Sequence, residues 1–189
     1  MIHVDPQPEP PGFDALVRQR GSRALAEGRE DLPPYWRDCL PDLYQCYRGV
    51  CAYLCVLIPR GTGARSVDHV APKSKRRDLA YEWGNYRLVS VLMNSRKREF
   101  EDVLDPFEID DGWFVLELSF LQVMPSPSLD EPTRSKVQAT IDRLGLNDAE
   151  CVAARALYYQ PYVEGLLAPE QLREWSPFVA RQALGPEGR

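Results

Sequence analysis

The stretch from residue 50 to residue 100 constrains the fold most, because its pattern changes from apolar to polar and back within a short distance. Residues 50–58, VCAYLCVLI, are apolar and β-branched enough to predict a strand. PRGTGA then predicts a turn, after which Arg65–Val70 would return as the second strand of a hairpin. Residues 71–87 predict an irregular loop, and Leu88–Phe100 predicts a helix. The expected order is strand, strand, loop, helix.

The flanking segments predict further helices and one more pair of strands. Residues 1–12 are proline-rich and indicate an arm outside the core. The apolar segments 112–118 and 120–124 predict two strands. Helices are expected at Phe13–Glu27, at Tyr35–Tyr47 with a break at Pro41, at Thr133–Leu144, at Asp148–Tyr158 with an Asn147/Glu150 capping box, and at Pro169–Leu184. The chain is therefore expected to be α+β, with an arm and helices in 1–49, a core with its following strands in 50–125, and a helical region in 126–189.

Positive charge is concentrated in one segment of an otherwise acidic chain. The net charge of −5 by itself argues against a protein that coats nucleic acid. Between Arg60 and Arg98, however, ten Lys and Arg residues stand against three acidic residues, whereas the rest holds 13 basic and 25 acidic residues. This basic window includes one of the two histidines, so it is a candidate surface for a polyanion.

Composition also indicates the compartment. No apolar run approaches 18 residues, and no basic-then-apolar leader opens the chain, so we expect a soluble cytoplasmic protein without membrane association. The five cysteines are odd in number and irregularly spaced, which favours reduced thiols over a disulfide framework.

Three polar residues of the basic window have the right chemistry for phosphodiester hydrolysis. Asp68 and His69, in VDHVAPKS, fall at the end of the second expected strand, and Asn94 lies on the expected helix that would pack back across it. A histidine can act as a base near neutral pH. Carboxylate and carboxamide oxygens suit Mg²⁺ or Mn²⁺, with water and phosphate completing the coordination.

The order and spacing of Asp68-His69, Asn85 and Asn94, followed by Lys97, resemble the HNH endonuclease family over roughly residues 50–100. The resemblance implies a ββα-metal core, here with flanking N-terminal helices, an extra β-hairpin and a C-terminal helical region. It implies that His69 is the general base, that Asp68 and Asn94 ligate one Mg²⁺ or Mn²⁺, and that Asn85 fixes the loop beside the base. DVLDPF and GWFVLEL also resemble the extended bacterial members found in antiviral defence operons beside an ATPase.

The basic side chains near these residues are the expected nucleic-acid contacts, with DNA as the first expectation and RNA as the second. Lys97, one helical turn beyond Asn94, would face the same groove and bind phosphate. The other expected contacts are Lys73, Lys75, Arg76, Arg77 and Arg96. For any one of them, a plain role in solubility is an equal alternative.

A structural zinc is not expected, although many HNH proteins carry two Cys-x-x-Cys pairs. Cys51 and Cys55 are one residue too far apart, and Ser90 and Met93 stand where the second pair would fall. A zinc built from Cys39, Cys46, Cys51 and Cys55 has irregular spacing and is the weaker alternative.

Two other classes of function compete with a nuclease. A non-catalytic nucleic-acid-binding module would need the basic window but none of Asp68, His69 and Asn94. An interaction subunit would use apolar residues of the C-terminal helices to dock an ATPase or a second copy of the chain. The simpler alternative is that these helices cover the sheet formed by residues 112–118.

Overall fold

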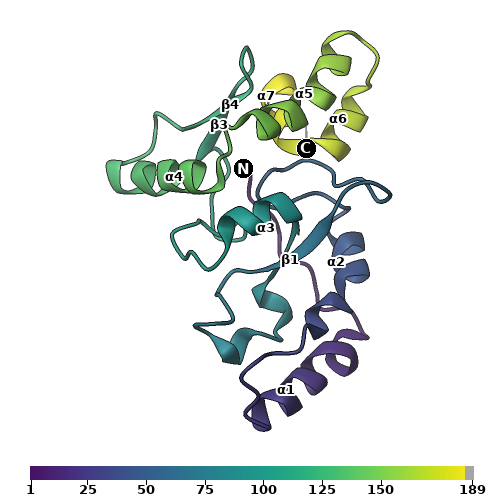
Figure 1. Ribbon diagram of the computed structural model, residues 1–189. Coiled ribbons are helices and arrows are strands. Elements are labelled where there is room, and N and C mark those ends of the chain that lie inside the picture. Colours follow the sequence, from purple (N-terminus) through teal and green to yellow (C-terminus); the bar gives the residue numbers. More distant parts are fainter. Residues whose placement is uncertain (186–189) are drawn as a thin grey trace.

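Two small antiparallel sheets form the middle of the molecule (Figure 1). The computed structural model describes residues 1–185. Strand β1 (Arg65–His69) pairs with β2 (Tyr86–Ser90), and the register places Asp68 opposite Arg87. Strand β3 (Phe114–Glu117) pairs with β4 (Gln122–Pro125), so residues 112–124 form the expected hairpin. With helices on both sides of these sheets, the chain belongs to the α+β class, as the sequence predicts.

Helix α3 (Val91–Lys97) follows β2 directly and packs against both strands of the first sheet. The hydroxyl of Ser90 caps the helix by accepting a hydrogen bond from the Met93 N–H at 3.3 Å. The helix ends at Arg98, whose φ of 49° lies in the left-handed region. The observed order within residues 65–97 is therefore strand, loop, strand, helix, and not the expected strand, strand, loop, helix.

Two of the expected boundaries in this stretch are wrong. Residues 51–55 form a buried turn instead of a strand, and the extended pairing nearby is a single bridge between Val50 and Leu57. The turn is closed by a hydrogen bond from the Cys55 N–H to the Cys51 carbonyl, with Cys55 at a φ of 56°. The partner of β1 is instead β2, which spans the end of the segment predicted as loop and the start of the segment predicted as helix. The apolar residues 51–55 are therefore buried by the elements that surround the turn and not by pairing within a sheet.

The N-terminal region folds into short helical segments against this core. They are the π-helical turn η1 (Asp14–Arg18), α1 (Gln19–Ala26), the 3₁₀ turn η2 (Tyr35–Arg37) and α2 (Leu40–Cys46). Pro41 does not break a helix but lies in the first turn of α2, where its missing N–H costs nothing. Where α1 passes Tyr81, the position of Gly21 leaves no room for a side chain, because a Cβ there would fall 2.0 Å from the ring.

The C-terminal region is helical, as expected, but its boundaries differ from the prediction. The helices are α4 (Glu131–Leu144), α5 (Ala149–Val163), α6 (Pro169–Trp175) and α7 (Pro177–Leu184). The expected helix at 169–184 is two helices, because Pro177 cannot continue the hydrogen bonding of α6 and begins α7 instead. The expected capping box of α5 is absent, since both groups of the Asn147 amide bind the backbone of Val123 on β4.

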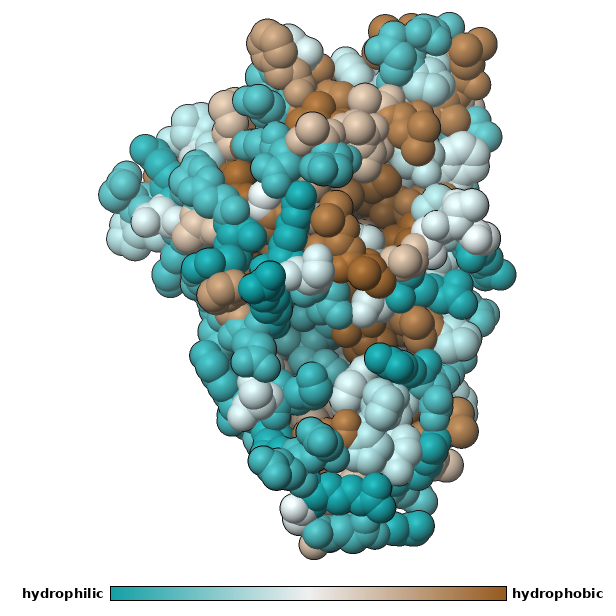
Figure 2. Space-filling view, in the orientation of Figure 1, coloured by the Kyte–Doolittle hydropathy of each residue, from teal (hydrophilic) through white to brown (hydrophobic). Residues whose placement is uncertain are grey.

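These helices cover the second sheet, with α4 packed on β4 and α7 on β3. Arg155 of α5 is fully buried and donates to the Leu121 and Leu146 carbonyls, which ties the hairpin to the connection between α4 and α5. Figure 2 shows hydrophobic residues gathered over the centre and upper right of the view and hydrophilic residues over the lower end, which contains α1. Among residues 1–185, the helices are too short or too polar to cross a bilayer.

A buried ion pair joins β2 to the segment that leads from α3 into the second sheet. Arg87 of β2 donates to both carboxylate oxygens of Asp105, at 2.7 and 2.6 Å, and its guanidinium lies over the Phe107 ring. Asp105 also accepts from the Phe107 N–H at 3.1 Å. Asp105 therefore turns the chain toward the second sheet.

Candidate active site

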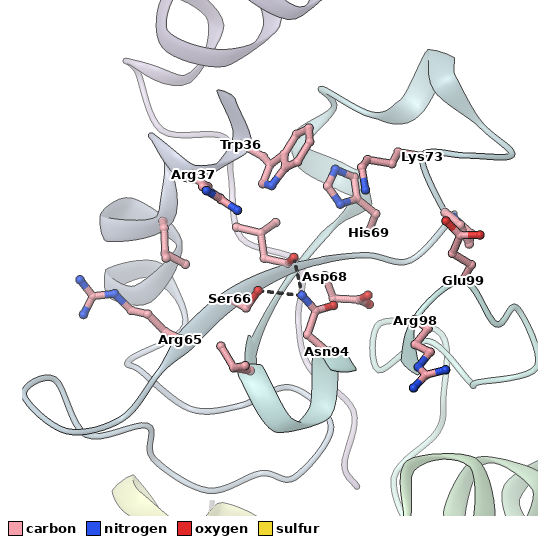
Figure 3. Close-up of a pocket in the computed structure, with 14 residues that line it drawn as sticks. Trp36, Arg37, Arg65, Ser66, Asp68, His69, Lys73, Asn94, Arg98 and Glu99 are labelled. Carbon is pink, nitrogen blue, oxygen red and sulfur yellow. Dashed lines mark hydrogen bonds between the residues drawn. The ribbon is translucent and has the colours of Figure 1, made fainter. Parts of the chain in front are cut away.

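A cavity of about 490 Å³ opens where β1 ends, and Asp68, His69 and Asn94 all line it (Figure 3). Asp68 and His69 are the last two residues of β1, and Asn94 projects from the middle of α3, which packs on that strand. Two residues that point to opposite sides of a regular strand reach one cavity here, because the strand stops at His69. The three chemically distinctive residues of the basic window are therefore neighbours in space.

The hydrogen bond of His69 fixes which ring nitrogen is available. Its Nε2 lies 3.0 Å from the Ala80 carbonyl, and a carbonyl can only accept, so the neutral ring carries its proton on Nε2. Nδ1 then presents a lone pair and has no hydrogen-bond partner among residues 1–185. The ring is also held edge-to-face between Trp36 and Tyr86, at centroid distances of 4.9 and 5.1 Å. This is a positioned, unprotonated imidazole nitrogen.

Burial lowers the pKa of His69 to about 4, and the positive charges of Lys73 and Lys97 act in the same direction. The hydrogen bond to Ala80 opposes them but does not reverse the shift. The imidazole is consequently neutral, and able to accept a proton, throughout the physiological range. A phosphate anion bound beside it would raise this pKa, because the opposite charge stabilises the imidazolium.

Asp68 lines the cavity but is almost fully buried, with 1 % of its surface exposed. Its Oδ2 accepts a hydrogen bond from the Tyr53 hydroxyl at 2.7 Å, and its Oδ1 lies 3.4 Å from the Lys97 ammonium. Burial raises the pKa of Asp68, and the nearby cation and the hydroxyl hydrogen bond work against that rise. Each carboxylate oxygen keeps a second lone pair, so this side chain can still ligate an ion from the cavity.

Asn94 completes a pair of oxygen ligands. Its Nδ2 donates to the Ser66 hydroxyl at 2.7 Å and lies 3.4 Å from the Val67 carbonyl. With the amide nitrogen occupied, the Oδ1 has no hydrogen-bond partner within residues 1–185, and Figure 3 shows the amide beside the Asp68 carboxylate. One carboxylate and one carboxamide oxygen fit a divalent ion that takes its remaining ligands from water and substrate, as Mg²⁺ does.

No cluster of three or more His, Cys, Asp or Glu side chains that could enclose a metal occurs within the described residues. The five cysteines are free thiols, four of them buried, and Cys51 accepts a hydrogen bond from the Ser90 N–H.

Asn85 ties the loop after β1 to the loop before β2. Its Oδ1 accepts from the Ala71 N–H at 2.8 Å, and its Nδ2 donates to the Ala71 and Leu79 carbonyls, both at 3.0 Å. Leu79 precedes Ala80, whose carbonyl binds His69. Asn85 lies in the 3₁₀ turn η4 (Trp83–Asn85), and Leu79 ends the 3₁₀ turn η3 (Arg77–Leu79). The side chain therefore holds the backbone that orients the imidazole.

Lys97 does not lie on the groove surface, where the sequence placed it. Only 1 % of Lys97 is exposed, and its ammonium donates to the His69 carbonyl at 2.6 Å and the Val70 carbonyl at 2.9 Å besides approaching Asp68. An ammonium enclosed in this way is not available to a phosphate. Lys97 is buried because it is the last residue of α3, where its side chain points toward the end of β1.

Arg96 is also directed away from the cavity. Its Nη1 donates to the Leu144 and Gly145 carbonyls at the end of α4, at 2.9 and 3.0 Å, and its Nη2 pairs with Asp148 at 3.0 Å. The expected nucleic-acid contact is instead a link between α3 and the C-terminal helices.

The expected contacts in the loop after β1 divide into two groups. Lys73 lines the cavity, with its ammonium 5.4 Å from the centre of the Trp36 ring. Lys75 and Arg76 are exposed but paired with Glu101 and Asp78, at 2.5 and 2.7 Å. Arg77 donates to the backbone carbonyls of Arg29 and Glu30. Of this basic run, Lys73 is the residue that faces the cavity.

The cavity also contains residues outside the predicted site. Trp36 and Arg37 come from η2, nearly thirty residues before β1, and Arg65 and Arg98 come from the two ends of the strand–helix unit. Together with Lys73, these arginines form no ion pair within residues 1–185, and the acidic side chains lining the cavity are Asp68 and Glu99. Only the position of Arg65 and Arg98 inside the basic window could have indicated them.

A scan of the sequence against models of known protein families finds no match, and a search of curated proteins finds none. Inferences about function therefore depend on the geometry and chemistry of this cavity.

Proposed function

We propose that this chain is a metal-dependent endonuclease of the HNH type, in which His69 activates water to hydrolyse a phosphodiester bond. The observation that carries the proposal is the hydrogen bond from His69 Nε2 to the Ala80 carbonyl, which leaves Nδ1 as a lone-pair acceptor in the cavity shared with Asp68 and Asn94. The succession of β1, β2 and α3 agrees with the ββα core that such an enzyme needs.

In the proposed reaction, His69 Nδ1 takes a proton from a water molecule, and the water oxygen forms a bond to phosphorus. The bond between phosphorus and the leaving oxygen breaks, and that oxygen is protonated from solvent. Asp68 and Asn94 would hold one Mg²⁺ or Mn²⁺, which when bound neutralises charge on the phosphate and the leaving oxygen. Lys97 and Asn85 contact no substrate and keep Asp68 and His69 in place.

A polyanionic substrate is supported by the charge around the cavity. Arg37, Arg65, Lys73 and Arg98 line it without ion-pair partners in residues 1–185, although the whole chain carries a net charge of −5. Cations left uncompensated at one concave surface attract phosphates and make binding depend on salt. DNA is the substrate we propose first, and RNA second.

The test is digestion of plasmid, single-stranded DNA and RNA by the purified chain in Mg²⁺ or Mn²⁺. We expect cleavage that a chelator abolishes and that His69→Ala reduces by about a hundredfold or more, the usual contribution of a general base. His3→Ala, which changes the other histidine of the chain, is the matched control and should cleave as the parent does. Equal cleavage by His69→Ala would remove the assigned base, and a parent inactive on every substrate would remove the proposed activity.

A second candidate, supported by the same cations, is nucleic-acid binding without cleavage. It differs in its need for the ion, because Asp68 and Asn94 have no part in binding alone. Affinity measured with and without Mg²⁺ separates the two, since a pure binder shows a salt dependence but little gain from the ion.

Docking of an ATPase or a second copy through the C-terminal helices stays a prediction. Leu157, Val163 and Leu166 are 63 %, 60 % and 77 % exposed, whereas Leu144 and Leu146 are buried. The mass of the purified chain in solution, alone and mixed with a candidate ATPase, tests it.

A further inference from the structure

The turn η2 forms a wall of the cavity from outside the strand–helix unit. Trp36 and Arg37 line the cavity together with His69 and Asn94, although the turn belongs to the N-terminal region. In Figure 3 their side chains lie across the cavity from Asn94, with Trp36 next to the His69 ring. A ligand bound in the cavity beside His69 would therefore lie close to this turn.

The turn is held firmly, so its side chains are presented in a fixed place. The Tyr81 hydroxyl donates to the Pro33 carbonyl at 2.9 Å, just before the turn, and the Cys39 thiol donates to the Trp36 carbonyl. The rings of Tyr35 and Trp36 both pack against the Tyr81 ring, with centroid separations of 6.0 and 5.9 Å. Tyr81 belongs to the same loop as Ala80, whose carbonyl orients His69.

Both side chains offer donors that the protein itself does not use. Within residues 1–185, the indole N–H of Trp36 and the guanidinium of Arg37 have no hydrogen-bond acceptor, and Arg37 has no acidic partner. By contrast, the indole N–H of Trp83 donates to the Gln7 carbonyl at 2.8 Å. A neutral N–H beside an arginine, both facing a cavity, suits the oxygens of a phosphate group.

We propose that Trp36 and Arg37 form a clamp for the phosphate next to the scissile one along the nucleic-acid strand. Trp36 separates Arg37 from His69 along the cavity wall, so Arg37 reaches a neighbouring phosphate and not the reacting one. The proposal rests on the nuclease function proposed above and deepens it, since it gives the site a need for at least two consecutive phosphodiesters. The clamp acts in substrate binding and takes no part in proton transfer.

The decisive experiment compares two substrates. Parent, Arg37→Ala and Arg23→Ala are assayed on an oligonucleotide and on bis(4-nitrophenyl) phosphate, a small diester without a neighbouring phosphate. Arg23 is an exposed arginine of α1 without an ion pair in the described chain and lies away from the cavity, so it is the matched control. For Arg37→Ala we expect the loss in kcat/KM to be at least about tenfold larger with the oligonucleotide, mainly through KM.

A binding measurement supplies an independent readout. Oligonucleotide affinity is measured by fluorescence anisotropy over a range of salt concentrations, with Ca²⁺ replacing Mg²⁺. Loss of one phosphate contact should lower the slope of log K against log salt by about one in Arg37→Ala and leave it unchanged in Arg23→Ala. Trp36→Phe keeps an aromatic ring at this position but removes the N–H, so we expect about a three- to tenfold weaker affinity with an unchanged slope.

Each outcome separates the clamp from the function on which it rests. If the parent cleaves but Arg37→Ala keeps the parental affinity and slope, the clamp is wrong and the nuclease stands. If Arg37→Ala loses equally on both substrates, the arginine acts at the scissile phosphate, and the proposed position of the clamp is wrong. A parent that neither binds nor cleaves nucleic acid overturns both proposals.

Discussion

At the scale of single residues, the site depends on groups kept in unusual protonation and burial states. His69 is 9 % exposed, and its neutral form is the one that the surroundings stabilise. Lys97 is a buried ammonium that serves two carbonyls and one carboxylate. Each state has a consequence for the stability of the whole chain, which can be measured without any substrate.

The low pKa of His69 predicts a dependence of stability on pH. In the unfolded chain a histidine takes up its proton near pH 6.5, whereas in the folded chain His69 resists protonation until about pH 4. The unfolded state therefore binds more protons between these values, and stability should fall as the pH is lowered from 6.5 to 4, by up to roughly 2–3 kcal/mol. Chemical denaturation of the parent and of His69→Gln across this range measures it.

Carboxylates titrate in the same range in both proteins, so the informative quantity is the difference between the two curves. As the pH approaches 4, the free energy of unfolding of the parent should fall more than that of His69→Gln. Parallel curves would show that burial does not disfavour the charged ring.

Removal of the Lys97 ammonium should be costly. Lys97→Met leaves the buried Asp68 carboxylate without its cation and two carbonyls without a donor, and we expect a loss of about 3–5 kcal/mol in the free energy of unfolding. Lys136→Met, on the exposed side of α4, is the control and should change little. In an Asp68→Asn background the same substitution should cost less, because no charge is left uncompensated. An equal cost in both backgrounds would assign the effect to the carbonyls alone.

At the scale of elements, the sequence predicts the grouping of the candidate site residues more accurately than it predicts the strands. Asp68, His69 and Asn94 share a cavity because strand β1 and the helix that follows are where the pattern indicated. Residues 51–55 were read as a strand because apolar composition reports burial, and burial is equally satisfied by an enclosed turn. The true partner β2 is divided between the predicted loop, which includes Tyr86 and Arg87, and the predicted helix, because residues 88–90 continue the apolar pattern of α3.

Contacts between distant segments were beyond the reach of local patterns. Nothing around Trp36 and Arg37 indicates that they meet His69, since the meeting depends on how α1 and η2 pack against the loop that contains Tyr81. The burial of Lys97 was missed for a similar reason. Spacing places it one turn from Asn94, but its direction is decided by the end of β1.

The close approach of α1 to this loop gives a prediction at the same scale. Gly21→Ala would place a methyl group 2.0 Å from the base of the buried Tyr81 ring, which cannot move aside as a flexible tip would. We expect a destabilisation of about 1–3 kcal/mol, in spite of the better helix propensity of alanine. Thermal or denaturant unfolding measures it.

Gly84→Ala is the control, because nothing lies within 4 Å of the position of its Cβ. A Gly21→Ala variant as stable as the parent would mean that α1 does not rest on Tyr81.

At the scale of the whole molecule, two arginines connect the C-terminal helices to the rest. Arg155 binds carbonyls of the second hairpin and of the α4–α5 connection, and Arg96 binds the end of α4 from α3. The strand–helix unit and the C-terminal region are therefore joined by hydrogen bonds to backbone carbonyls as well as by apolar contacts.

Loss of this connection should loosen the C-terminal region. Arg96→Met keeps the aliphatic stem but removes the donor to the Leu144 carbonyl and one of the two donors to the Gly145 carbonyl, so we expect a loss of about 1–3 kcal/mol. Limited proteolysis should then cut the parent slowly and the variant faster between residues 144 and 149. Arg23→Met, at an exposed arginine of α1, should leave both stability and the cutting pattern as in the parent. Unchanged cutting in Arg96→Met would show that apolar contacts alone hold this region.

Helix α3 carries Asn94 toward the cavity and Arg96 toward the end of α4. It is seven residues, or roughly 10 Å, long, so its two ends cannot shift independently of each other. A displacement of the end of α4 would consequently shift α3 and, with it, the Asn94 amide beside Asp68. The C-terminal helices are thus linked to the cavity through α3, although none of their described residues lines it.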